Sequence, residues 1–302
     1  MIKEHIQIKD GRYTLYIKYQ HDQKLRLEFN RMTEEFWGFD FENYYQSGFW
    51  DDNCILYSLF DGDKIVSHTT VSLFENEGKI LIQLGTVMTD IHYQKRGLSR
   101  FLMERIMCDF NGKHDGIFLF ANETVLDFYP KFGLIPTSEF ECFFSVKNAD
   151  FVTKLDKRRL DLDDPEDLRL FETSVENAFP NSKFSTRNKA LDFFYCYAYP
   201  ELGFKNSIFF IDEFSCVVVV QIEDGVLYLI DIFAPDEINS RGLIGAFSDF
   251  SFEVVVFGFT PKETAGFHFR NYKEDDLQLF ISPELQPIFE KERLRVHLLS
   301  HT

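Results

Sequence analysis

Residues 89–104 read TDIHYQKRGLSRFLME, and this stretch determines the fold that we expect for the chain. The apolar segment KILIQLGTVMTD (79–90) leads into it and has the composition of a buried strand. From residue 99 to 110 the apolar positions share one helical face, and GIFLFA (116–121) follows as a second apolar strand. This order of strand, helix and strand predicts a mixed, partly parallel α/β sheet flanked by helices.

The loop between the first strand and the helix has the properties of an anion-binding site. The first backbone N–H groups of a helix have no partner inside it and lie at the positive end of its dipole. Gly97 lets a ligand approach the backbone closely, while Lys95 and Arg96 add positive charge. No GxxxxGK[ST] occurs, and no GxGxxG follows a strand, which excludes two common phosphate loops. Taken alone, an ordinary surface turn before a helix is the simpler interpretation.

Local patterns divide the chain into two domains. A charge-dense segment with Pro165 ends the first half, so we expect domains at residues 1–147 and 166–302, joined by a linker at 148–165. In the first domain we expect a hairpin at 3–19, helices at 25–45, 99–110 and 124–133, and strands at 55–62, 64–75, 79–90, 116–121 and 141–148. In the second we expect a first helix and strands at 207–212, 216–225, 226–236 and 253–259.

Two motifs resemble those of the GNAT superfamily, the acyl-CoA-dependent N-acetyltransferases. LGTVMTDIHYQKRGLSRFLM (84–103) is similar to motif A, a strand followed by Q/R-x-x-G-x-G/A and a helix. Gln94, Gly97 and Ser99 occupy its defining positions, with serine where Gly or Ala is usual. FANETVLDFYPKFGL (120–134) resembles the second motif, with an Asn after the next strand and a Tyr ahead of Phe-Gly. The resemblance covers residues 1–147.

The resemblance implies a role for each motif residue. The loop amides would bind the coenzyme A pyrophosphate, and the end of the preceding strand would pair with the pantetheine arm and the acyl carbonyl. Tyr129 would protonate the leaving thiolate. Alternatives remain open: Val87 as a core residue, Asn122 as a helix cap, and Tyr129 as an aromatic packed on Phe132. The residues implied for coenzyme binding are Val87, Thr89, Gln94, Lys95, Arg96, Gly97, Leu98, Ser99 and Asn122.

The general base and the acceptor pocket are less well defined. Members of the family often use a Glu on the central strand or a water chain as the base, and this strand offers Gln83. Asp90 either turns the chain or takes part in the chemistry, and we expect His92 to face solvent. The aromatic and acidic segment 32–52 forms either core or a pocket for a cationic amine with an apolar body.

The second domain repeats a short sequence feature of the first. Arg-Gly-Leu occurs at 96–98 and again at 241–243, each time after a strand and before an expected helix. The later segment TPKETAGFHFRNY (260–272) lacks the Asn, Phe-Tyr and Phe-Gly of the second motif. We therefore expect a degenerate, non-catalytic GNAT-like domain, which either covers the acceptor pocket or forms a contact in a homodimer.

Composition limits the partners. The net charge of -17 argues against nucleic acid and anionic membranes as partners. No apolar run approaches the roughly 20 residues that cross a bilayer, and the N-terminal pattern is not that of a secretory signal. The five cysteines form no CxxC pair and the eight histidines have no zinc-ligand spacing, so we expect reduced thiols, no metal and a cytoplasmic location.

These observations favour an enzyme that transfers an acetyl group from acetyl-CoA to a small-molecule amine by direct attack on the thioester. A non-catalytic acyl-CoA-binding module is the alternative, and the absence of a Glu on the central strand favours it. A purely structural pair of α/β domains is the third interpretation.

Overall fold

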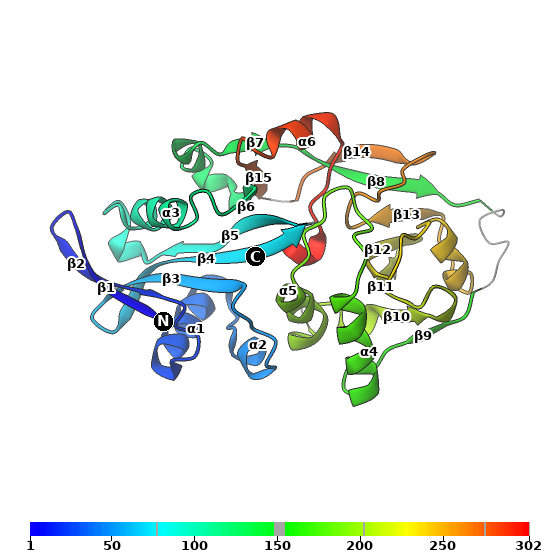
Figure 1. Cartoon of the computed structure of the whole chain (residues 1–302), viewed down its shortest axis with the longest axis horizontal. Coiled ribbons are helices and arrows are strands. Elements are labelled where there is room, and N and C mark those ends of the chain that lie inside the picture. Colours follow the sequence, from blue (N-terminus) through cyan, green and yellow to red (C-terminus); the bar gives the residue numbers. More distant parts are fainter. Residues whose placement is uncertain (77, 148–154, 202, 275, 302) are drawn as a thin grey trace. The chain divides into compact units, whose positions relative to one another are not determined.

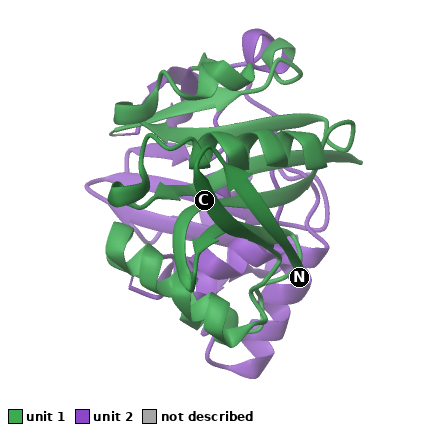
Figure 2. Ribbon diagram, turned by 90° about the vertical axis from the view of Figure 1, so that its left-hand side faces the viewer, with its two compact units in different colours: residues 1–137, 276–287, 302 green, residues 138–275, 288–301 purple. Residues whose placement is uncertain are grey.

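The computed structural model describes residues 1–76, 78–147, 155–201, 203–274 and 276–301. The chain divides into two compact units, which Figure 2 colours separately. Unit 1 comprises Met1–Thr137 and Asp276–Pro287, and unit 2 comprises Ser138–Asp275 and Ile288–His301. The division between the units therefore falls at residue 137 rather than 147, and a late segment of the chain returns to unit 1. Residues 148–154 of the expected linker lie outside the described residues.

Unit 1 contains an eight-stranded mixed sheet (Figure 1). The pair β5–β6 is parallel and the other neighbouring pairs are antiparallel. The expected hairpin and the expected strands up to residue 121 are confirmed. In spatial order the strands are β1 (Ile2–Ile8), β2 (Gly11–Ile17), β3 (Cys54–Asp61), β4 (Lys64–Asn76), β5 (Lys79–Thr89), β6 (Gly116–Asn122), β15 (Leu277–Ile281) and β7 (Ile135–Thr137).

Helices cover both faces of this sheet. α3 (Leu98–Asp109) packs with the large apolar cluster of unit 1, in which Leu102 and Ile106 meet strand residues such as Leu84. α1 (Gln23–Trp37) covers the opposite face, where its Phe29 ring lies 4.7 Å from that of His68 on β4. Alternation along the strands thus separates an α3 face from an α1 face.

Two expected helices differ from the structure. The expected helix 25–45 is interrupted because Gly38 ends α1 in the left-handed region at φ 75°, and a short α2 (Glu42–Gln46) follows. The expected helix 124–133 consists of two 3₁₀ turns, η2 (Glu123–Val125) and η3 (Tyr129–Phe132). Pro130 lacks the N–H group that a continuous helix would use, and Gly133 ends the second turn at φ 81°.

Unit 2 contains a seven-stranded sheet with the same connectivity as the first. Its one parallel pair is β12–β13, flanked on both sides by antiparallel pairs. α4 (Pro165–Glu176) and α5 (Lys189–Phe193) precede its central strands, as expected for a helix-first domain. In spatial order the strands are β14 (His268–Tyr272), β8 (Glu139–Ser145), β13 (Val254–Phe257), β12 (Val226–Phe233), β11 (Cys216–Glu223), β10 (Ile208–Ile211) and β9 (Lys157–Arg159).

The two sheets exchange one strand each. In unit 1, β15 lies between β6 and the edge strand β7, and in unit 2, β8 lies between β13 and the edge strand β14. Each inserted strand follows directly on the edge strand of the other sheet, so the exchange is reciprocal. We expected β8 to end the first domain, which is wrong because it pairs with β13 and β14. The matching strand order makes the two units tandem copies of one topology.

Candidate active site

The site in unit 1 begins where β5 and β6 separate. Their parallel pairing covers only Leu81–Gln83 on β5 and Gly116–Phe118 on β6. β5 continues to Thr89 while remaining paired with β4 on its other side. Among the described residues, the β6-facing backbone of Leu84–Thr89 therefore has no strand partner. This open edge offers amides and carbonyls to an extended ligand.

A β-bulge lies within the open edge. The register between β4 and β5 shifts between His68 and Thr70, opposite Thr86 and Val87. Thr86 has φ 44°, in the left-handed region that β-branched residues rarely adopt, and its side chain is half-buried. Strain of this kind costs on the order of 1–3 kcal/mol and is concentrated at functional sites. Val87, expected beside a thioester, is half-buried on the same bulge.

The basic loop gives α3 an open N-terminus. Lys95 and Gly97 both have positive φ values, 63° and 88°, and Gly97 is the N-cap. No side chain caps the helix and its first turn contains no acidic residue, so its leading amides remain available for an anion. A further cation reaches this loop, because Lys9 of the β1–β2 turn donates from Nζ to the Lys95 carbonyl at 3.4 Å. Sequence reasoning missed Lys9, since only the fold brings it here.

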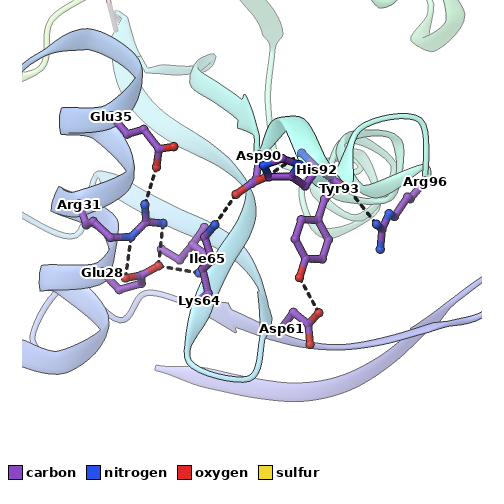
Figure 3. A network of polar contacts seen from close by, with 10 residues as sticks. All are labelled: Glu28, Arg31, Glu35, Asp61, Lys64, Ile65, Asp90, His92, Tyr93 and Arg96. Carbon is purple, nitrogen blue, oxygen red and sulfur yellow. Dashed lines mark hydrogen bonds and ion pairs between the residues drawn. The ribbon is translucent and has the colours of Figure 1, made fainter.

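Arg96 and Gln94 are both exposed on this loop. The Arg96 guanidinium lies 4.5 Å from the centre of the Tyr93 ring and donates to the His92 carbonyl at 2.8 Å (Figure 3). Tyr93 in turn donates from its hydroxyl to Asp61 at 2.8 Å. These contacts hold the loop against the end of β3.

Thr89 and Ser99 connect the strand to the helix. Their hydroxyls are 2.6 Å apart, and the Thr89 hydroxyl is also 2.9 Å from that of Ser67 on β4. The serine in the third motif position therefore has a structural use that Gly or Ala would lack. Leu98 is buried in the α3 core and contributes its backbone to the loop.

Asp90 serves as an anchor. Its carboxylate accepts from Lys64 Nζ at 2.6 Å and from the His92 backbone N–H at 2.8 Å (Figure 3). The hydrogen bond from Lys64 lowers the pKa of this carboxyl. His92 is exposed, as expected. Neither residue has the surroundings of a general base.

Glu28 of α1 anchors that helix to the sheet close by. Its carboxylate accepts from the Ile65 backbone N–H at 2.9 Å and from Arg31 at 2.8 Å (Figure 3). The start of β4 is thereby tied to α1.

Tyr129 lies in the apolar core cluster with 4% of its surface exposed. Its ring contacts Phe128 and Phe280, at centroid distances of 5.2 and 5.6 Å. Its hydroxyl makes no hydrogen bond to any described residue, and burial raises the pKa of the phenol to about 12. A protonated, unpaired hydroxyl of this kind can donate a proton to a ligand.

Asn122 caps the turn that follows β6. Its Oδ1 accepts from the Thr124 backbone N–H at 3.0 Å and from the Thr124 hydroxyl at 2.8 Å. The capping role that we considered for Asn122 is thus observed. Asn122 is exposed at the end of β6.

A row of buried polar side chains lies on the α1 face, and sequence reasoning missed it. His68, fully buried on β4, has Nδ1 2.7 Å from the Ser58 hydroxyl and Nε2 2.8 Å from the Thr70 hydroxyl. The row extends from Ser58 to the Tyr19 hydroxyl at 2.6 Å, and from Thr70 to the Thr86 hydroxyl. The only signal in the sequence is the polar run SHTT (67–70) inside an otherwise apolar strand.

Gln83 lies on the same face, on the last residue of β5 that pairs with β6. It is fully buried, and neither atom of its amide has a hydrogen-bond partner among the described residues. An unsatisfied buried amide costs about 1–3 kcal/mol and is a rare feature in a native core.

The aromatic segment after α1 is partly core and partly surface. Tyr44 and Trp50 are buried and stack at 5.2 Å, whereas Phe36 and Trp37 are 42% and 43% exposed. Ring contacts connect exposed Trp37 through Phe39 and Phe41 to the buried Phe29, with centroid distances of 5.2 to 6.4 Å. Tyr44 and Trp50 are therefore core residues, whereas a pocket for an amine at the exposed aromatics stays a prediction.

The corresponding loop of unit 2 has two of its amides hydrogen-bonded within the loop itself. η8 (Gly242–Phe247) is a short 3₁₀ helix where α3 stands in unit 1. The Arg241 and Gly242 amides donate to Asn239, to its side chain at 3.1 Å and to its carbonyl at 2.9 Å. The repeated Arg-Gly-Leu therefore leaves no open amide cradle.

The strand ends of unit 2 are also covered. The segment after α6 (Gln286–Lys291) bonds to the end of β13 through Leu298 N–H and the Gly258 carbonyl, at 3.1 Å. On β12, Asp231 accepts from His297 Nδ1 at 3.1 Å, and His297 Nε2 lies 2.7 Å from the Ser182 hydroxyl. Ser182 is only 4% exposed, so this Ser-His-Asp chain anchors the C-terminal segment and is closed to a substrate.

The described part of the chain offers neither a metal-binding cluster nor a membrane-spanning helix. No group of three or more His, Cys, Asp or Glu side chains there could hold a metal ion. No helix in the same residues has the length and apolarity needed to cross a membrane.

Solved structures share this architecture. A conserved protein of unknown function from Enterococcus faecalis V583, described as a probable N-acyltransferase, matches with a TM-score of 0.57 and 12% identity over 91% of this chain and 74% of that one. A GCN5-related N-acetyltransferase from Kribbella flavida matches with a TM-score of 0.53 and 16% identity over 88% and 71%. Eis1 from Mycobacterium abscessus matches with a TM-score of 0.52 and 14% identity over 88% and 72%. No protein-family model matches the sequence, and neither does any curated protein.

Proposed function

Since the chain has the fold of the GNAT superfamily, we propose that it is an acetyl-CoA-dependent N-acetyltransferase with its active site in unit 1. One observation carries the proposal: the open edge of β5 leads directly to the uncapped N-terminus of α3. An extended arm ending in a pyrophosphate needs both features, in this order along the chain. Unit 2 keeps the topology, but its Arg241 and Gly242 amides are bonded to Asn239 and a short 3₁₀ helix stands in place of α3, which supports a non-catalytic role for it.

The residues present fit coenzyme A. The amides at the start of α3, with Lys9 and Lys95 beside them, suit a pyrophosphate. The unpaired backbone of Leu84–Thr89 suits the two amides of a pantetheine arm, and the Gln83 amide supplies a further donor and acceptor. In this arrangement the acyl group lies at the bulge, beside Val87.

The reaction we propose is direct transfer. The amine nitrogen attacks the thioester carbonyl carbon, a C–N bond forms, and the C–S bond breaks when the tetrahedral intermediate collapses. Tyr129 gives its proton to the departing thiolate and regains one from solvent. Its burial keeps it protonated throughout the neutral range.

The amine enters as its free base in this scheme. Gln83 is an amide, Asp90 is held by Lys64, and His92 is exposed, so none of the bases considered from the sequence can take the proton. The proton released by the attacking amine passes to solvent water. The pH dependence of kcat/KM should then follow the pKa of the acceptor, moving when one amine is replaced by another of different basicity.

The acceptor we propose is an amine attached to an apolar body. The contacts from Trp37 to Phe29 form an aromatic path toward the face of the sheet that carries the bulge. Such rings bind apolar groups and, over their faces, cations. Glu34 lies exposed on the same turn of α1 and favours a positive charge nearby.

The test measures acetyl-CoA binding by calorimetry and free thiol release over a broad panel of amines. A matched pair of variants locates the site. Gly97→Ala changes the glycine before α3, at φ 88°, and Gly112→Ala changes the glycine after it, at φ 69°. Both place a side chain on a left-handed backbone, and neither added Cβ meets a clash. Gly97→Ala should weaken acetyl-CoA binding about tenfold, the equivalent of about 1.4 kcal/mol. Gly112→Ala should leave it unchanged. Equal effects of the two variants, or no binding to the wild type, would refute the proposed site.

The same experiment addresses the binding-module alternative, which the amide at Gln83 favours. Acetyl-CoA binding that depends on Gly97 together with background thiol release for all amines would establish that alternative. Amine-dependent thiol release above background would exclude it.

A further inference from the structure

The buried polar row on the α1 face forms one continuous hydrogen-bonded chain. In order it joins the hydroxyl of Tyr19, the hydroxyl of Ser58, the His68 ring, and the hydroxyls of Thr70 and Thr86. The first four residues are at most 4% exposed, and Thr86 is half-buried. This row of hydrogen bonds therefore starts in the core, at Tyr19, and ends at the bulge, at Thr86.

The buried end fixes the direction in which every proton points. Among the described residues the Tyr19 hydroxyl has one partner, Ser58, so its proton must be donated to Ser58 to avoid a buried, unsatisfied donor. Ser58 then donates to His68 Nδ1, which places the ring proton on Nε2. His68 donates from Nε2 to Thr70, and Thr70 donates to Thr86.

The Thr86 proton is left to donate outward. Its acceptor role is already filled by Thr70, and the described residues supply no other partner for its hydroxyl. Each member of such a chain polarises the next, which strengthens the last donor. Burial lowers the pKa of His68 to about 3, so the ring stays neutral and the direction holds at physiological pH.

Thr86 is also held in place by its backbone. It is the bulged residue at φ 44°, one position before Val87, where the proposed acyl group lies. A regular strand would orient this side chain differently, so the strained backbone conformation and the hydrogen bond from Thr70 together fix the hydroxyl at the edge of the site.

We propose that the Thr86 hydroxyl donates a hydrogen bond to the thioester carbonyl oxygen and to the oxyanion formed when the amine attacks. His68 and Thr70 are positioning residues that act through it. The proposal rests on the acetyltransferase function proposed above. During attack the carbonyl π electrons move onto this oxygen, and they return when the C–S bond breaks. Thr86 keeps its proton throughout, because it stabilises charge without exchanging atoms.

The first test compares Thr86→Val, which removes the hydroxyl and keeps the shape, with Thr86→Ser, which keeps the hydroxyl. Loss of one oxyanion donor costs about 10²–10³ in kcat, so Thr86→Val should lose that much and Thr86→Ser should stay within about tenfold of wild type. Acetyl-CoA affinity by calorimetry should change less than threefold in both. Thr70→Val should give an intermediate loss of kcat, since it removes only the donor to Thr86.

The pH profile distinguishes a donor from a base. If Thr86 is a donor, the kcat/KM profile of Thr86→Val is lowered uniformly and keeps its shape. A wild-type kcat in Thr86→Val, or a profile that loses its acidic limb, would overturn the proposal. If the wild type is active and Thr86→Val has the same kcat, only this inference is refuted. If the wild type releases no thiol with any amine, the proposed function and this inference are refuted together.

The second test needs neither turnover nor a variant. Nitrogen NMR of the wild-type protein should show the His68 ring as the neutral Nε2–H tautomer from pH 5 to pH 9. An Nδ1–H tautomer would reverse the direction of the chain, leave Thr86 without a proton to donate, and overturn the proposal.

Discussion

Replacing Tyr129 with Phe separates a catalytic hydroxyl from a packing residue. The Tyr129 ring contacts Phe128 and Phe280, and the variant retains both contacts. The hydroxyl makes no hydrogen bond to any described residue, so its removal should change the free energy of unfolding by less than about 0.5 kcal/mol. If the hydroxyl protonates the leaving thiolate, kcat should fall about 10²–10⁴-fold, which corresponds to about 2.7–5.4 kcal/mol in activation free energy.

Tyr57→Phe is the matched control. Tyr57 is 4% exposed, like Tyr129, but its hydroxyl donates to Asp109 at 3.1 Å. This variant should lose about 1 kcal/mol of stability and keep its kcat, the opposite result. Thiol release measures kcat, and urea unfolding measures stability.

The pH dependence gives an independent check on Tyr129. Because burial raises the pKa of its phenol to about 12, Tyr129 stays protonated up to about pH 10.5. Wild-type kcat should therefore not fall through loss of this proton below that pH. Full kcat in Tyr129→Phe, or a large loss of stability together with kcat, would refute the reasoning and leave Tyr129 as a core residue.

Two further predictions concern unit 2 and the strand exchange. Burial raises the pKa of Asp231, but Arg187 and His297 outweigh it and lower the pKa overall; the resulting stabilisation is present above the unfolded pKa near 3.8 and is lost as the pH falls through the folded value. Asp231→Asn should therefore cost about 3–5 kcal/mol at pH 7 and progressively less as the pH falls below 3.8, by urea unfolding; a loss that does not change with pH would contradict this. A chain ending at residue 275 lacks β15 of unit 1 and also residues 288–301 of unit 2, so it should lose cooperative unfolding during heating, measured by circular dichroism. A cooperative transition with native strand content would show that both segments are dispensable.

Much of unit 1 could be predicted from local patterns. The β1–β2 hairpin follows from alternation around Asp10-Gly11, and β5, α3 and β6 follow from their periodicity and the glycine at the loop. These predictions are confirmed. They concern elements that follow one another along the chain, so local sequence patterns were sufficient to make them. The split of the first helix was missed, although Gly38 in the sequence is a typical C-terminal signal.

The exchanged strands could not be predicted in this way. An alternating apolar segment such as β8 fits the edge of either sheet, and which sheet it joins depends on partners more than a hundred residues away along the chain. β15 was not expected as a strand. The candidate site residues at the loop were predicted from their motif, whereas Lys9 and the hydrogen-bonded row through His68 depend on tertiary pairing of β1, β3 and β4.

The reciprocal exchange of β8 and β15 also sets an order of events during synthesis. A ribosome releases every strand of unit 2 before residues 277–281, so the place between β6 and β7 stays empty until these residues have also been released. The open edges of β6 and β7 are exposed during that interval and are available for wrong pairing. Nascent chains should therefore need protection until β15 has left the ribosome, and the candidate site beside β6 can become rigid only when β15 has been inserted.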